Sequence, residues 1–126
     1  RLIIKEFPIL GPQSTIMSRF AIAVQQESTP EHYEEAHDRL MLWDGDFTQT
    51  SARLLADELG LDGDNVLAQM DSPAVDAILQ SNHELAQRLQ ISGTPTFVMG
   101  DVDGGELVRG YRQADELREI VSRLRG

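Results

Sequence analysis

Residues 91–99 read Ile-Ser-Gly-Thr-Pro-Thr-Phe-Val-Met, and this stretch decides the fold. Small and polar residues and one proline lead directly into a short apolar run. Pro95 has no N–H to donate to a β-ladder, which favours a place at the start of a strand. The bond before a proline is also the one kind of peptide bond whose cis form is accessible, at about 0.5–1 kcal/mol above trans. The stretch therefore predicts a loop that opens a strand at Thr96.

Composition excludes several kinds of chemistry. The chain has 126 residues, a net charge of −10 and no cysteine. The length suits one domain with its own core. The negative charge disfavours nucleic acid as a partner, because an acidic surface repels phosphates. The lack of cysteine excludes disulfides, thiolate metal sites and thiol catalysis by this chain alone. No apolar run is long enough to span a bilayer, and no signal-peptide pattern opens the chain.

The hydrophobic pattern predicts one strand, then helices, then a hairpin and a closing helix. Gly11-Pro12, Thr29-Pro30 and Ser72-Pro73 mark the beginnings of helices. The expected strands cover residues 2–7, 96–99 and 106–110, and the expected helices follow residue 12 and cover about 30–43, 52–59, 63–70, 73–89 and 113–125.

Three separated stretches together resemble the DsbA-type thiol:disulfide oxidoreductases. They are residues 5–14 (Lys-Glu-Phe-Pro-Ile-Leu-Gly-Pro-Gln-Ser), residues 37–41 (His-Asp-Arg-Leu-Met) and residues 93–98 (Gly-Thr-Pro-Thr-Phe-Val). The resemblance implies an α/β thioredoxin-like fold in a single domain over residues 1–126. It implies an inserted helical subdomain at about 12–91. It also implies that the first strand and the redox helix would precede Arg1, so that this N-terminal βα unit is missing.

The resemblance implies dithiol–disulfide exchange on protein substrates. That chemistry needs a Cys-x-x-Cys pair, so we expect no catalytic residue, no cofactor and no activity in this chain alone. The resemblance implies that the Thr94–Pro95 bond is cis and that Thr94 and Pro95 bind the substrate. Their partner would be a protein or peptide segment in extended conformation. By analogy with the family, we expect a periplasmic or other extracytoplasmic location.

The sequence does not exclude two other functions. One is a cysteine-free thioredoxin-fold module that binds peptides or acts as a chaperone. The other is the glutathione-using branch of the fold, in which a serine can replace the nucleophilic cysteine. The residues encoded just before Arg1 would separate the three functions.

The remaining polar motifs have structural explanations. The spacing of His32, His37 and His83 does not match a zinc site, and we expect no metal. Asp101 and Asp103 superficially resemble part of a calcium loop, but the other ligands of such a loop are absent. A hairpin turn that contains Gly104-Gly105 explains these residues better. We expect Met41, Trp43 and Phe47 in the core or at an interface of the helical insertion.

The expected strands 2–7 and 96–99 are too apolar to remain open sheet edges. If the strand between them is missing, three arrangements are physically reasonable. In the first, the two strands pair directly; in the second, a second copy of the chain supplies strands; in the third, another segment fills the gap. The residues favour association of two copies, because direct pairing would shift every helix on the sheet.

Overall fold

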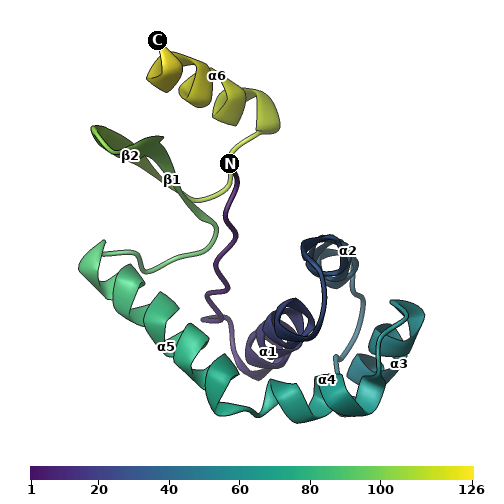
Figure 1. Ribbon diagram of the computed structural model, residues 1–126. Helices are drawn as coiled ribbons and strands as arrows, with labels where there is room; N and C mark the ends of the chain where they lie inside the picture. The colour runs from purple at the N-terminus through teal and green to yellow at the C-terminus, as the bar shows by residue number, and fades with distance from the viewer. The chain divides into compact units, whose positions relative to one another are not determined.

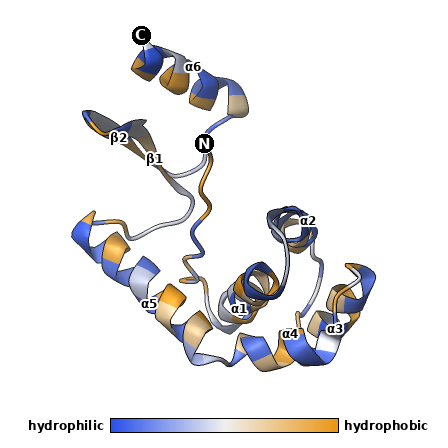
Figure 2. Cartoon of the chain, viewed as in Figure 1, coloured by the Kyte–Doolittle hydropathy of each residue, from blue (hydrophilic) through white to orange (hydrophobic).

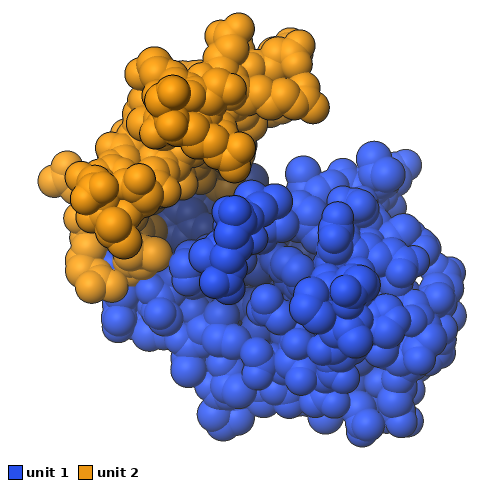
Figure 3. Space-filling model, turned by 45° about the horizontal axis from the view of Figure 1, so that its top comes forward, with its two compact units in different colours: residues 1–84 blue, residues 85–126 orange.

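A computed structural model describes all residues, 1–126. It contains six helices and one two-stranded sheet (Figure 1). In chain order the elements are α1 (Pro12–Glu27), α2 (Pro30–Met41), α3 (Gln49–Glu58), α4 (Gly63–Met70), α5 (Pro73–Arg88), β1 (Thr96–Asp101), β2 (Gly104–Arg109) and α6 (Ala114–Arg125). The chain divides into two compact units, residues 1–84 and 85–126, which Figure 3 shows in different colours.

Side-chain caps set the beginnings of the helices in the first unit. The Thr29 side chain accepts a hydrogen bond from the backbone N–H of His32 at the start of α2. Thr48 and Ser51 form a reciprocal capping box at the start of α3. Each cap satisfies a backbone N–H that has no partner inside the helix. The predicted helices at 30–43 and 52–59 are therefore confirmed, with small shifts at their ends.

The core of the first unit lies among α1, α2, α3 and α4. The Phe47 ring is fully buried and makes edge-on contacts with Phe20 and Trp43, with ring centroids 5.4 and 5.0 Å apart. The other buried residues of this core are Ala23, Val24, Ala36, Ala52, Leu55, Ala56, Leu59, Val66 and Met70. Figure 2 shows the hydrophobic residues of these helices interspersed with hydrophilic ones along each ribbon. Met41, expected in the core or at an interface, is 73% exposed.

The segment 2–7 forms no strand, so this part of the secondary-structure prediction is wrong. The sheet contains β1 and β2 alone. Leu2 and Ile3 are 83% and 61% exposed, although both are typical strand residues. The physical reason is that β-propensity describes how well a side chain fits a sheet, whereas a strand exists only where a ladder partner is present.

The second unit is built on the β1–β2 hairpin. The strands are antiparallel, with Thr96 opposite Arg109 and Gly100 opposite Gly105. A Cβ atom added at Gly100 would lie 2.3 Å from the backbone oxygen of Gly104, so the close approach of the two strands at this position requires glycine. The turn is shorter than predicted, because β2 begins at Gly104 rather than at Glu106.

Helix α6 closes the second unit and contacts β1. Its half-buried residues are Leu117, Ile120 and Val121, whereas Leu124, the next apolar residue at helical spacing, is 39% exposed. An ion pair of 2.9 Å between Arg123 and Glu106 also joins α6 to β2. The predicted closing helix is confirmed, and it is held to the hairpin by one apolar face and one ion pair.

Candidate functional site

The loop before β1 has the geometry that the sequence predicts. The Thr94–Pro95 peptide bond is cis. The backbone N–H of Gly110 donates a hydrogen bond of 2.9 Å to the carbonyl of Pro95. Within the loop, the Thr96 hydroxyl donates to the carbonyl of Gly93 at 2.8 Å. These two hydrogen bonds fix the loop against the open end of the hairpin.

A side chain of β2 holds the segment that immediately precedes this loop. Gln90 follows the end of α5 in a left-handed conformation, with φ of 56°. Its carbonyl oxygen accepts a hydrogen bond of 2.7 Å from the Arg109 guanidinium. Arg109 lies opposite Thr96 in the hairpin register. One arginine therefore links the segment that leads into the loop to the strand that leads out of the hairpin.

The loop and the end of β2 surround a small hollow of about 180 Å³, which we call the loop hollow. Its lining consists of Ser92, Gly93, Thr94, Pro95, Thr96, Arg109 and Gly110. Thr94 and Pro95 are exposed, and Thr94 makes no backbone hydrogen bond within the chain. The backbone N–H and C=O of Thr94, an exposed residue, therefore have no partner within the chain, and the hollow that Thr94 lines holds a single charged side chain, Arg109.

A second polar group, the Glu6 cluster, lies in the first unit. The Glu6 carboxylate accepts hydrogen bonds from the Tyr33 hydroxyl at 2.7 Å and from the Ser18 hydroxyl at 3.0 Å. The Asn82 amide donates to the Glu6 backbone carbonyl at 2.8 Å. Ser18, Tyr33 and Asn82 are buried. These contacts hold the segment around Glu6 to α1, α2 and α5.

The Glu6 cluster strongly affects the ionisation of Tyr33. Burial raises the pKa of the Tyr33 hydroxyl well above its ordinary value, and the negative charge and hydrogen bond of Glu6 raise it further. Tyr33 therefore stays neutral and acts as a hydrogen-bond donor. Sequence reasoning missed this cluster. The only available signal was that Glu6 falls within one of the family-like stretches.

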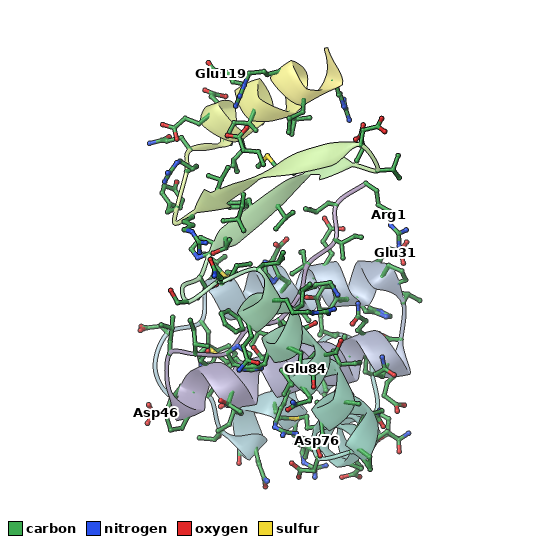
Figure 4. The ribbon with its side chains drawn as sticks, turned by 90° about the vertical axis from the view of Figure 1, so that its left-hand side faces the viewer. Arg1, Glu31, Asp46, Asp76, Glu84 and Glu119 are labelled. Atoms are coloured by element: carbon green, nitrogen blue, oxygen red, sulfur yellow. The ribbon has the colours of Figure 1, made fainter.

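The two units differ in charge. Residues 1–84 contain five basic and 15 acidic residues, whereas residues 85–126 contain six of each. The whole net charge of −10 therefore lies in the first unit. Glu31, Asp46 and Asp76, which are labelled in Figure 4, are exposed acidic residues of that unit.

The other residues considered from the sequence form no joint site. No group of three or more His, Asp or Glu side chains is placed to hold a metal ion. Asp101 accepts a hydrogen bond of 2.9 Å from the backbone N–H of Asp103, which makes it part of the hairpin turn. No helix has both the length and the apolar character that crossing a membrane requires.

A proline loop that opens a hairpin, with a set of helices before it, is typical of part of a thioredoxin-like α/β fold. The family of DSBA-like thioredoxin domains matches residues 4–122, and the chain belongs to this family. No protein among the curated sequences matches the chain.

Solved structures agree with this assignment. A thioredoxin-like oxidoreductase from Silicibacter pomeroyi DSS-3 is 36% identical, with a TM-score of 0.81 over 96% of this chain and 66% of its own. The thiol-disulfide exchange protein alpha-DsbA2 from Wolbachia pipientis is 26% identical, with a TM-score of 0.83 over 97% and 64%. A periplasmic thioredoxin-like protein from Salmonella enterica serovar Typhimurium is 25% identical, with a TM-score of 0.73 over 96% and 64%. The chain thus spans just under two thirds of the length of these proteins.

Proposed function

We propose that the chain serves in thiol–disulfide exchange on protein substrates, as part of a DsbA-like thioredoxin domain. In this proposal residues 1–126 belong to one domain, and the redox cysteines come from a segment outside these residues. Such a cysteine pair would supply the exchange of thiolate and disulfide. The chain's own residues would bind the substrate. Family membership and the lack of cysteine support this division of roles.

The observation that carries the proposal is the exposed backbone of Thr94 beside Pro95. A substrate segment in extended conformation can pair with this backbone as an added strand, a mode in which main-chain hydrogen bonds supply the affinity. The loop is fixed by the hydrogen bonds of Pro95 and Thr96, so little ordering is needed when the segment binds.

Binding can be tested with the chain as it is. A short capped peptide of β-prone residues should shift the backbone amide resonance of Thr94 in an NMR titration. The matched control is the same peptide with N-methyl groups on alternate residues, which removes the N–H donors that face the loop. Loss of the shift with the control supports strand addition. Equal shifts from both peptides contradict it.

The chemical part of the proposal needs a separate measurement. The chain alone should show no reduction of insulin and no oxidation of a reduced protein, because a methionine thioether cannot exchange with a disulfide. Turnover above background would contradict the assignment of the reaction to cysteines outside residues 1–126.

A cysteine-free binding or chaperone module is the second candidate, because the lack of cysteine in residues 1–126 fits both functions equally. Both candidates require the peptide to bind at Thr94. They differ in whether cysteines accompany the site in the whole protein. Mass spectrometry of the purified native protein, after alkylation of its thiols, decides between them.

We also propose association of two copies through residues 2–7, and an extracytoplasmic location. Exposed Leu2 and Ile3 support the first proposal, because an extended apolar segment without a ladder partner favours pairing with another chain. Sedimentation of the chain at several concentrations tests it, and a monomer at all of them contradicts it. The periplasmic relative from Salmonella supports the second proposal.

A further inference from the structure

The loop hollow contains one charged side chain, and the hairpin determines its position. Arg109 is the last residue of β2 and lies opposite Thr96, the first residue of β1. Its hydrogen bond to the Gln90 carbonyl holds the guanidinium beside the loop. The same hollow is lined by Thr94 and Pro95. A segment bound along Thr94 would therefore pass within reach of a fixed cation.

The Arg109 charge has no anionic partner in the chain. The ion pairs in residues 85–126 are formed by Arg112, Arg118 and Arg123. Arg109 donates to a backbone carbonyl only, and a guanidinium has five N–H donors. Most of its donors therefore remain available to a ligand.

A second guanidinium, that of Arg112, lies near the hollow but does not line it. The Nη1 atom of Arg112 would lie 3.9 Å from a Cβ atom built on Gly110, which is one of the lining residues. Arg112 is paired with Glu116 at 4.0 Å and its Nη1 donates to the Tyr111 carbonyl at 2.9 Å, so the positive charge of the hollow rests on Arg109. No acidic residue lines the hollow.

We propose that Arg109 makes the loop selective for extended protein segments that carry a glutamate or aspartate side chain next to the residue bound at Thr94. This inference rests on the proposed function, and it specifies the class of substrate. An arginine binds a carboxylate through charge-assisted and often paired hydrogen bonds, which a neutral side chain cannot match. Because Arg109 is exposed, the preference is modest, and we expect acidic peptides to bind about two- to fivefold more tightly than neutral ones.

The test uses capped peptides of one β-prone sequence that differ at two adjacent central positions. Adjacent side chains of a strand point to opposite faces, so one of the two faces Arg109 in either orientation. The positions carry Glu, Gln or Lys. A fourth peptide has Gln at both positions and a free C-terminal carboxylate. Dissociation constants for the full chain come from calorimetry at low and at high salt.

For the unsubstituted chain, we expect the affinity order Glu, then Gln, then Lys, with the differences reduced at high salt. Arg109→Gln should abolish the preference, so that the Glu, Gln and Lys peptides bind this variant with similar affinities. Arg109→Glu should reverse the order. Arg118→Gln is the matched control, since Arg118 pairs with Asp115 on α6 and the substitution removes the same charge from outside the hollow lining.

The possible outcomes distinguish failure of the acidic preference from failure of the proposed function. If the chain binds all peptides equally, or if Arg109→Gln retains the preference, the inference is wrong although the proposed function stands. If the fourth peptide alone is preferred, the carboxylate recognised is a chain terminus rather than a side chain, which also contradicts the inference. If no peptide binds, the proposed function fails and the inference fails with it. Backbone amide spectra of each variant establish that the hairpin is intact.

Discussion

Replacing Tyr33 by phenylalanine removes one buried hydroxyl and leaves the ring in place. That hydroxyl donates to the Glu6 carboxylate at 2.7 Å, and Tyr33 is 8% exposed. Hydrogen bonds to charged groups contribute about 1.5–3 kcal/mol to stability. We expect the lower half of that range, because Glu6 is half-buried and keeps its hydrogen bond from Ser18.

The same substitution should change the response to alkaline pH. The pKa of Tyr33 is raised in the folded chain, whereas a tyrosine in the unfolded chain titrates near its ordinary value of about 10. Below that pH the contribution of Tyr33 to stability is fully present. Above it the unfolded chain loses a proton that the folded chain keeps. The free energy of unfolding therefore falls by about 1.4 kcal/mol for each further pH unit.

Urea unfolding of both proteins, followed by helical circular dichroism, measures these effects. The stability difference between the wild type and Tyr33→Phe should be constant from about pH 7 to about pH 9, and should shrink above about pH 10. Tyr111→Phe is the control, because Tyr111 is 74% exposed and its loss should change stability by less than about 0.5 kcal/mol. A Tyr33→Phe chain as stable as the wild type, or a difference that does not change with pH, would refute the reasoning.

Three further substitutions test other parts of the structure. Phe47→Ala should lower the free energy of unfolding by about 3–5 kcal/mol in urea titrations, because the ring is fully buried, and a loss below about 1 kcal/mol would contradict this packing. Gly100→Ala should remove the cross-strand amide contacts of the hairpin in NMR spectra, whereas Gly93→Ala, with nothing within 4 Å of its added Cβ, should keep them. Thr48→Ala should cost about 0.5–2 kcal/mol through loss of the capping box with Ser51, and an unchanged urea midpoint would show that this cap is dispensable.

The helices were predictable because their signals are local. A Thr-Pro or Ser-Pro pair marks a helix start within a few residues, and apolar spacing marks the buried face without any knowledge of distant contacts. The Thr29 cap at the start of α2 follows from such a signal. The prediction of a strand at residues 2–7 was wrong for the opposite reason. Their composition suits a strand, but a strand depends on a partner elsewhere in the chain or in another chain.

The candidate site was predictable only in part. Thr94 and Pro95 belong to one contiguous motif, so they could be found from neighbouring letters. Arg109 reaches the same hollow because the hairpin register places it opposite Thr96, and a motif of consecutive residues does not include that cross-strand pair. The contact of Glu6 with Tyr33 joins residues 27 positions apart, and nothing in the local pattern of either residue indicates it.

The uneven distribution of charge has a consequence for how a substrate is attracted. The helical unit, with its net charge of −10, draws cations toward itself from a distance, whereas the unit that holds the loop carries no net charge. At physiological ionic strength, electrostatic forces fade over about 8 Å. Long-range attraction by the chain therefore acts on basic partners, while the choice made at the loop depends on groups that reach it directly.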